Sequence, residues 1–517
     1  MNIWAMQGAG LATAVLVSVA GCGGDSDSDS DNTVQSGTGG DGGSGGVVLA
    51  TGGAGETGGA DGGGSGSPGG GGSGGGSGGS TGGSGGTGNA SGDSGAAGAE
   101  PRPEPPELPA RWSDRMQFEP PESDYAANPD LVVDSAGVGH VLLHAGDLFV
   151  VTLDPQAGWG TPEMVHEHIG SSAIAMNASD DAVAVWAPAW SETDYLLGTA
   201  NYVDGTWTAG NPVGTVPAYR MNELSVSMSD DGTALAVWLA SDSTATVNAV
   251  QAARFDGTSW EGPEDLGPSE IQDLASQTVA MDADGRGAAV WRNQEPDTGN
   301  DFIEASRFDG SAWSQPERIS GSEPGGYLPH VAMRPTGEAI AIFERMYEVC
   351  AVPFDPSAGW GTPEQLTAGE RSGYAAGPEI GFDGSGNALA LWREETSDYN
   401  FRCITARYDA ASGWEPSQML SIDEGQFEAE PYNHVAVNAS GQGIGVWSQS
   451  DYHYRSFWAC LYDPSSGWGA PVMLDDGADD GTGAVLDAGI DSAGNAWVVW
   501  ERQKEDRAVV AAHFTAP

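Results

Sequence analysis

Residues 275–319 read ASQTVAMDADGRGAAVWRNQEPDTGNDFIEASRFDGSAWSQPERI. An apolar run ends in a D-x-x-G turn, and a run of small residues then ends in Val-Trp. After a polar loop, a further run ends in an Asp-Gly turn with a Trp close behind it. Short runs rich in Val and Ala, interrupted by Asp, Gly and Pro, indicate strands rather than helices. The stretch therefore predicts four consecutive strands.

The same pattern recurs along most of the chain. The residue that closes the second strand serves as a ruler, and its successive occurrences lie 43 to 55 residues apart. The position six residues earlier holds the turn glycine in every repeat except one, where it is Asp180. A four-strand unit of this period is typical of a β-propeller blade. The second-strand marks are Leu143, Trp186, Trp238, Trp291, Phe343, Trp392, Trp447 and Trp500.

A second series of tryptophans follows the turn between strands three and four, and it ends one repeat early. Its members are Trp159, Trp207, Trp260, Trp313, Trp360, Trp414 and Trp468. Trp112, in the segment 111–120 before the first repeat, resembles the missing fourth strand. We therefore predict an all-β, eight-bladed β-propeller over residues 111–517, whose last blade is closed by an N-terminal strand so that no sheet edge stays open. Seven blades are the alternative, because the first repeat is short.

Residues 1–22 are expected to form an export signal. The apolar run from Ala9 to Ala20 is too short to span a membrane and has the length of a signal-peptide core. The sequence Val19-Ala20-Gly21-Cys22 resembles the lipobox of bacterial lipoproteins. This resemblance implies acylation of Cys22 and a lipid-anchored location at the outer membrane or cell surface. A signal followed by an unmodified cysteine is the alternative.

Residues 23–110 are dominated by Gly and Ser and end in a proline-rich stretch. They contain too little apolar surface to offset the entropy lost on ordering. We expect this segment to be a disordered tether between the anchor and the propeller.

The charge of the chain limits its partners. Nineteen Lys and Arg against 73 Asp and Glu give a formal net charge of −54. A field of this sign disfavours nucleic acids and anionic lipid headgroups. Cationic partners, divalent ions and neutral glycans remain compatible with it.

The cysteines Cys350, Cys403 and Cys460 fall on the predicted third strands of consecutive blades. Cys350 and Cys403 have opposite parity along their strands, so a disulfide across one blade interface is conceivable. Packed sheets lie about 10 Å apart, which is too far for an unstrained disulfide. Buried free thiols are the expectation and the disulfide the alternative.

Candidate binding residues gather on one face of the predicted ring, where the loops vary in length. Variable loops on a rigid frame usually carry function. Arginines follow the second-strand marks, often beside a glutamate, at Arg292, Arg345, Arg393 and Arg502. Tyrosines lie in the loops between blades at Tyr125, Tyr219, Tyr327, Tyr374 and Tyr432. Aromatic faces and arginine donors would suit a sugar ring, whereas solvated Arg–Glu pairs and tyrosines packed under their own loops are the structural alternative.

Catalytic and metal signals are weaker. The Asp…Trp turn between strands three and four resembles the Asp-box of sialidases without its spacing, and the chain carries no G-x-S-x-G, H-E-x-x-H or P-loop motif. No catalytic residue is assigned. We expect no cofactor or metal, although calcium could bind carboxylates at Asp475, Asp476, Asp479 and Asp480, or at Asp282 and Asp284.

The repeats resemble those of exported bacterial proteins with V-A-x-D-x-x-G-x-A-x-A-V-W units, seen most fully at 278–291 and 486–500. The resemblance implies a propeller and an extracytoplasmic setting, but no known activity. We predict a monomeric, lipid-anchored, non-catalytic propeller that binds a polysaccharide or a protein through its variable face. The alternatives are a secreted carbohydrate-active enzyme, a glycosidase or lyase, with its centre in the same mouth, and a passive envelope scaffold.

Overall fold

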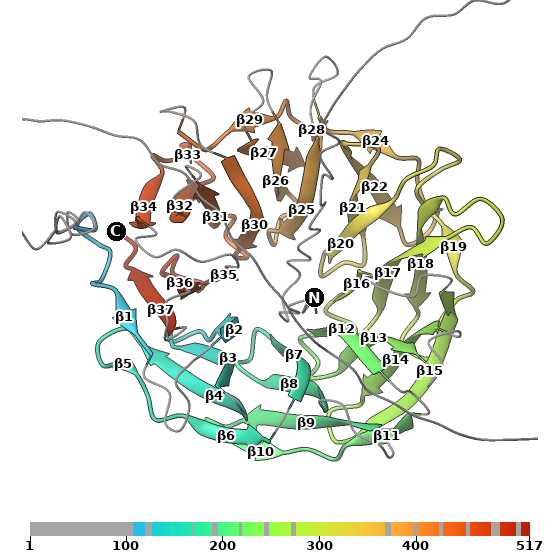
Figure 1. Ribbon diagram of the computed structural model, residues 1–517, viewed down its shortest axis with the longest axis horizontal. Helices are drawn as coiled ribbons and strands as arrows, with labels where there is room; N and C mark the ends of the chain where they lie inside the picture. Colours follow the sequence, from blue (N-terminus) through green and yellow to red (C-terminus); the bar gives the residue numbers. More distant parts are fainter. Residues whose placement is uncertain are drawn as a thin grey trace, which may run out of the picture. The chain divides into compact units, whose positions relative to one another are not determined.

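Eight antiparallel sheets follow one another around a ring in the computed structural model (Figure 1). This confirms the eight-bladed β-propeller and excludes seven blades. All described elements are strands, and within the described residues no helix is long and apolar enough to cross a membrane. The described residues are 107–118, 127–145, 147–167, 169–188, 195–216, 220–241, 248–269, 276–367, 374–395, 401–422, 428–450, 455–476, 486–502 and 508–517. Residues 1–22 and almost all of the predicted tether lie outside these ranges.

The first strand of each blade lies innermost, and each contacts the first strand of the next blade (Figure 1). These strands begin on the variable face and end at the D-x-x-G turns. In blades 1 to 8 they are β2 (Ala127–Val133), β7 (Ile169–Met176), β12 (Arg220–Met228), β16 (Gln277–Met281), β20 (Tyr327–Met333), β25 (Ala375–Phe382), β30 (Glu428–Val437) and β35 (Leu486–Ile490).

The second strands form the most completely buried layer. Small residues such as Ala and Gly recur in most of them and let neighbouring blades approach closely. The mark of each strand packs against the preceding blade. The strands are β3 (Gly139–Ala145), β8 (Ala182–Pro188), β13 (Ala234–Ser241), β17 (Gly287–Gln294), β21 (Ala339–Arg345), β26 (Ala388–Glu395), β31 (Gly443–Ser450) and β36 (Ala496–Arg502). The marks are thus wedges between blades.

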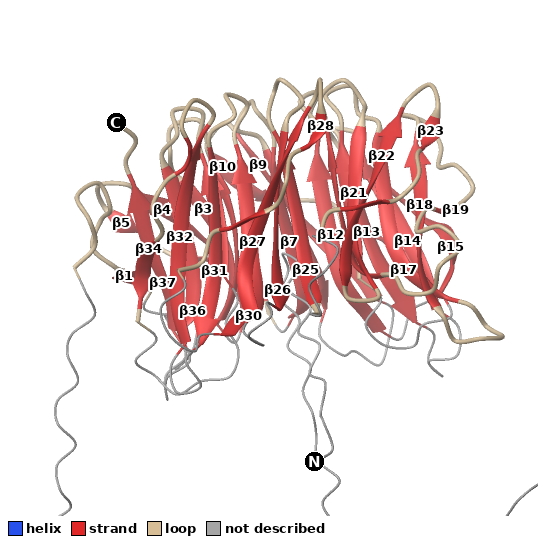
Figure 2. Cartoon of the chain, turned by 90° about the horizontal axis from the view of Figure 1, so that it is seen from above, coloured by secondary structure: helices blue, strands red, loops and turns tan. Residues whose placement is uncertain are grey.

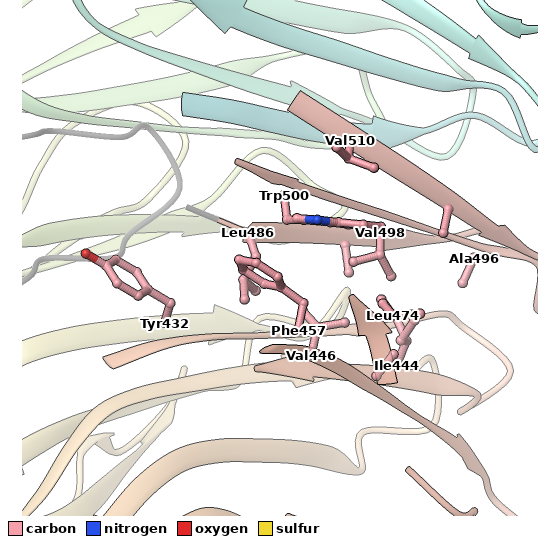
Figure 3. Packing of buried hydrophobic residues seen from close by; sticks show 13 residues of the cluster. Tyr432, Ile444, Val446, Phe457, Leu474, Leu486, Ala496, Val498, Trp500 and Val510 are labelled. Atoms are coloured by element: carbon pink, nitrogen blue, oxygen red, sulfur yellow. The ribbon is translucent and has the colours of Figure 1, made fainter. Parts of the chain in front are cut away.

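The interface between blades 7 and 8 illustrates this packing (Figure 3). Trp500 is fully buried and stacks on Phe457 with ring centroids 5.9 Å apart. Val446 and Val498 fill the interface beside them. A buried tryptophan removes about 200 Å² from water, which corresponds to roughly 5 kcal/mol as an upper estimate. Repeated at six tryptophan marks, this term accounts for much of the cohesion between blades.

The third strands place the three cysteines in different interfaces. They are β4 (Asp147–Asp154), β9 (Tyr195–Val203), β14 (Asn248–Phe255), β18 (Asp301–Phe308), β22 (Glu348–Asp355), β27 (Phe401–Asp409), β32 (Arg455–Asp463) and β37 (Ala508–Phe514). Cys350, Cys403 and Cys460 are buried free thiols. Cys350 packs between blades 4 and 5, whereas Cys403 packs with Cys460 between blades 6 and 7. The opposite parity of Cys350 and Cys403 therefore turns them away from each other, which corrects the disulfide alternative.

Most of the fourth strands are short, with β15 (Trp260–Ser269) as the exception at ten residues, and several are followed by a second segment that pairs with the third strand. They are β5 (Gly158–Trp159) with β6 (Glu163–His166), β10 (Thr206–Ala209) with β11 (Val213–Val216), β15 (Trp260–Ser269), β19 (Glu317–Arg318), β23 (Gly359–Trp360) with β24 (Glu364–Gln365), β28 (Gly413–Trp414) with β29 (Gln418–Met419), and β33 (Gly467–Trp468) with β34 (Val472–Asp475). In most blades the tryptophan here packs on the aromatic residue near the end of the third strand, as Trp360 does on Phe354 at 5.1 Å.

The eighth blade is closed by β1 (Met116–Gln117), which pairs antiparallel with β37. Trp112 forms a bridge with Phe514, and their ring centroids lie 5.5 Å apart, so Trp112 occupies the place of the other fourth-strand tryptophans. Arg115 donates through Nε to the carbonyl oxygen of Leu474 in blade 7. The predicted N-terminal closing strand is confirmed.

The turns between the first two strands form one face of the ring, drawn in tan in Figure 2. Gly285 has φ +77°, and Asp180, which replaces glycine in blade 2, adopts φ +65°. Asp282 accepts N–H hydrogen bonds from Asp284 and Arg286 through Oδ1, at 3.0 and 2.8 Å. Such a side chain replaces missing backbone partners in a tight turn. Asp282 therefore caps the turn, and Asp284 pairs with Arg286.

Candidate functional site

The opposite, variable face carries the candidate binding residues. Many of its loops lie outside the described residues, and with them Tyr125 and Tyr219 as well as Asp479 and Asp480. The described residues of this face include the loop at 295–300 within blade 4, the loop at 319–326 between blades 4 and 5, and the turn at 346–347 of blade 5. There the structure brings several predicted residues together.

Arg292 and Tyr327 meet across the interface between blades 4 and 5. The guanidinium carbon of Arg292 lies 4.6 Å from the centre of the Tyr327 ring, and its Nη2 lies 2.8 Å from Asp301 Oδ1. A β-bulge after Tyr327, with Leu328 at φ +47°, interrupts the pairing of β20 with β21. Bulges of this kind redirect side chains. Burial and then the hydrogen bond with Asp301 raise the pKa of Tyr327 to about 12, so its hydroxyl remains a donor.

Glu344 occupies in blade 5 the position that Arg292 occupies in blade 4, directly after the second-strand mark. Its side chain is 4% exposed, and Tyr374 of blade 6 hydrogen-bonds to its carboxylate. Burial raises the pKa of Glu344 to about 7, although Arg393 and Arg292 favour its charged form. A carboxyl group that titrates near neutral pH inside a site is a recognised mark of function. In both blades, the residue directly after the mark reaches the tyrosine of the next blade.

Tyr374 is the centre of an aromatic group on blades 5 and 6. Its ring lies 5.3 Å from Tyr347 and 6.2 Å from Phe401, and the guanidinium of Arg393 lies 4.7 Å from the Phe401 ring and 5.5 Å from the Tyr374 ring. The backbone of Tyr374 exchanges hydrogen bonds with Glu395 at 2.8 and 3.1 Å. The ring is therefore held on a fixed backbone by stacked neighbours.

The turn between β21 and β22 presents two exposed apolar side chains beside this group. Met346 and Tyr347 are 57% and 60% exposed. Both have positive φ, at +48° and +75°, in a two-residue hairpin that normally favours Asn-Gly. Such conformations cost about 1 to 3 kcal/mol each for bulky residues and concentrate at functional sites. The Tyr347 carbonyl accepts the N–H of Ala375 at 3.0 Å, which joins the turn to blade 6.

We call this constellation the blade 4–6 site; it consists of Arg292, Asp301, Tyr327, Glu344, Met346, Tyr347, Tyr374, Arg393 and Phe401. It combines an exposed aromatic surface with hydroxyl donors, two guanidinium groups and two carboxylates. In a protein of net charge −54 it is a local concentration of arginine. The arrangement suits a ligand with an apolar face and hydroxyl groups along its edge.

The remaining predicted residues lie elsewhere. Tyr432 is only 9% exposed and belongs to the core between blades 7 and 8, where Figure 3 shows it beside Leu486 and Phe457. Arg502 forms an ion pair with the buried carboxylate of Asp475. Arg345 stands opposite Glu348 at the base of the Met346–Tyr347 turn. The sequence signal at Tyr432 and Arg502 thus marks residues whose observed contacts hold blades together.

Asp475 also accepts the indole N–H of Trp500, at 3.1 Å. It is therefore occupied by protein donors. Across the described ranges, no three His, Cys, Asp or Glu side chains are grouped in a way that could hold a metal ion.

Sequence reasoning missed a ring of mostly polar residues around the axis. Each stands seven residues before the turn glycine of its blade, or before Asp180 in blade 2. The spacing that was used to count the blades would therefore also have identified this ring. The ring consists of Asp130, Ala173, Ser225, Thr278, His330, Glu379, His434 and Asp487.

No protein-family model matches the chain, and no curated protein is similar to it in sequence. Among solved structures, a lectin from Burkholderia pseudomallei is 12% identical with a TM-score of 0.47, covering 67% of this chain and 98% of its own. A protein of unknown function from Dyadobacter fermentans is 11% identical with a TM-score of 0.40, covering 67% and 95%. A Penicillium chrysogenum α-L-arabinanase complexed with arabinobiose is 11% identical with a TM-score of 0.35, covering 58% and 99%. Likenesses at this level assign neither a family nor a function to this chain.

Proposed function

We propose that this chain is a non-catalytic saccharide-binding propeller, and that the blade 4–6 site holds the ligand. The carrying observation is the exposed Tyr347 in a strained turn, packed against Tyr374. A bulky aromatic residue at this turn position has a conformational cost, and its ring is left largely in water. Stacking of a sugar ring on Tyr347 would account for both the strained turn and the exposed aromatic ring.

The polar groups of the site supply the remaining recognition. Tyr327 and Tyr374 stay protonated because burial raises the pKa of both hydroxyls. Arg292 is positioned by Asp301, and Arg393 by the faces of Tyr374 and Phe401. Fixed donors around an aromatic surface favour a ligand with several hydroxyl groups, and a pre-organised site loses little entropy on binding.

The proposal includes a cellular setting. Lipid attachment at Cys22 and the tether of residues 23–110 would hold a monomeric propeller at the outer membrane or cell surface, where polysaccharides are available. Metabolic labelling with a fatty acid tests this part, because Cys22→Ser should abolish incorporation of the label.

Binding of the full chain to a polysaccharide array, followed by titration calorimetry with the best oligosaccharide, tests the function. Tyr347→Ala should weaken binding about tenfold, which corresponds to ~1.4 kcal/mol. Met419→Ala is the matched control, because Met419 is also an exposed apolar residue, at 45%, but lies on the outer strand β29. Equal binding by Tyr347→Ala and the wild type would reject this site.

A glycosidase or lyase is the second candidate, and Glu344 favours it. A buried carboxyl group whose pKa is about 7 has the property required of a general acid. The raised pKa of Tyr374 opposes a role for this hydroxyl as a nucleophile. Release of reducing ends from the bound polysaccharide, lost in Glu344→Gln, would establish the enzyme; binding without turnover would establish the lectin-like role.

A further inference from the structure

The innermost strand of each blade has an edge toward the axis that no further strand of its own sheet covers. Side chains of the axial ring accept hydrogen bonds from some of the backbone N–H groups of these strands. In blades 3 and 4 the ring residues are neutral. Ser225 Oγ accepts the N–H of Val279 at 3.3 Å, and Thr278 Oγ1 accepts the N–H of Val331 at 3.1 Å. Each hydroxyl thus binds the backbone of the next blade.

In blades 8 and 1 carboxylates make the same contact. Asp487 Oδ2 accepts the N–H of Leu131 at 2.7 Å, and Asp130 Oδ2 accepts the N–H of Ile174 at 3.1 Å. The first of these bonds crosses the seam at which the last blade meets the first. Both carboxylates are buried, with exposures of 7%.

His434 in blade 7 connects the carboxylates on either side of it. Its Nδ1 lies 2.9 Å from Glu379 Oε2 in blade 6, and its Nε2 lies 3.2 Å from Asp487 Oδ1 in blade 8. One imidazole can donate to both carboxylates only when both ring nitrogens carry protons. Close contact with a carboxylate oxygen at both ring nitrogens favours the charged form of His434.

We propose that His434 and the carboxylates of Glu379, Asp487 and Asp130 form a pH-dependent latch that holds blades 6, 7, 8 and 1 together while His434 is protonated. The latch does not involve the blade 4–6 site or its ligand. The latch couples closure of the ring to pH, because the bridge ends at the seam between blades 8 and 1.

The titratable groups around His434 are acidic except one. Glu379 faces it from β25, Asp487 from β35 and Asp130 from β2, while His330 approaches from β20. The partner opposite His434 on β31 is the apolar Val446. Burial lowers the pKa of His434, but the three carboxylates outweigh it and raise the pKa to about 10.

The sign of the effect follows from this shift. A histidine whose pKa is raised on folding contributes stability that is complete below its ordinary pKa of about 6.5 and is lost as pH rises through about 10. Burial also raises the pKa of Asp130 and Asp487. Carboxyl groups shifted in this direction likewise favour the folded state less as pH rises. The whole latch therefore weakens toward alkaline pH.

Thermal unfolding of the full chain from about pH 6 to about pH 10.5 tests the latch, with wild type, His434→Gln and Thr278→Val compared. Thr278→Val removes an uncharged contact at the same ring position. We expect the difference in Tm between wild type and His434→Gln to be large near neutral pH and to shrink through about pH 10. The difference for Thr278→Val should stay constant. A constant difference for His434→Gln would overturn the proposal.

If His434→Gln does not fold, Glu379→Gln provides the second test, read by NMR of the His434 ring protons in the full chain. In the wild type the imidazole should remain charged at pH 8, and Glu379→Gln should lower its titration midpoint by about one unit or more. An imidazole that titrates near its ordinary value of about 6.5 in the wild type would overturn the latch.

Discussion

Blades 5 and 8 end their second strands with the same residue types, an aromatic mark followed by Glu and Arg, at 343–345 and 500–502. In blade 8 the arginine, Arg502, pairs with Asp475 of blade 7. In blade 5 the glutamate, Glu344, is buried beside Tyr374 and takes part in a surface site. The same three residues thus fasten two blades in one place and form a candidate binding site in another.

The difference lies in what the neighbouring blades provide. Blade 7 places an acid at the end of β34, within reach of both Trp500 and Arg502. Blade 6 instead places Tyr374 beside Glu344, and the tight turn of blade 5 adds Tyr347. A second-strand motif therefore acquires its role from the partner across the interface.

Asp475→Asn should produce the largest effect. It leaves Arg502, whose side chain is 21% exposed, without its buried carboxylate partner, and we expect a loss of about 2 to 4 kcal/mol in the free energy of unfolding. Urea denaturation measures this loss. The double variant Asp475→Leu/Arg502→Met removes both charges and should recover part of the stability. If Asp475→Asn is as stable as the wild type, the ion pair between Arg502 and Asp475 does not hold blade 8 to blade 7, and the contrast with blade 5 fails.

Glu344→Gln should change stability in a pH-dependent way. Because folding raises the pKa of Glu344 from 4.5 to about 7, its contribution is complete below about pH 4.5 and is lost as pH rises through about 7. At pH 8 we expect the variant to be more stable than the wild type by up to about 3 kcal/mol. Urea denaturation at several pH values tests this, and a difference that does not change with pH would contradict the buried, titrating carboxyl group.

Met346→Asn/Tyr347→Gly replaces the strained turn of blade 5 with residues that adopt positive φ readily. We expect stabilisation of about 1 to 2 kcal/mol, because the turn no longer holds bulky residues in the left-handed region. Saccharide binding should fall at the same time. Thermal unfolding and calorimetry on one sample measure both. A variant that binds like the wild type would separate the turn from the site.

Asp355→Asn should have the smallest effect. Asp355 caps the turn between β22 and β23, a turn that blade 8 lacks because β37 and β1 are not consecutive in the chain. Hydrogen bonds from the Ser357 side chain and then from backbone N–H groups lower its pKa. Its contribution is present above the ordinary pKa and is lost as pH falls below it. We expect a slight decrease in Tm at neutral pH that disappears in acid.

Much of the fold could be predicted from short-range patterns. Gly285 and its equivalents mark turns that need positive φ, and Trp112 marks the closing strand because it has the same neighbours as the other fourth-strand tryptophans. For the site, Arg292, Tyr327, Tyr374 and Arg393 were predicted and do lie together. Asp301, Met346, Tyr347 and Phe401 were missed, because their place in the site depends on the residues that the adjoining blade presents.

The sequence by itself predicted eight blades, with seven as the alternative, and their strand order, since turns and neighbouring strands are set by residues close together in the chain. It also predicted the closure of the ring, because the last repeat lacks a fourth strand and residues 111–120 resemble one. Only the tertiary structure decided that Tyr432 and Arg502 belong to blade interfaces, that Cys403 faces Cys460, and that the axial ring includes a charged bridge at His434. Those outcomes depend on side chains about fifty residues apart that meet at the same height in neighbouring blades. Aligning the repeats shows which residue each blade presents at a given height, but it does not show which of these residues bond to one another.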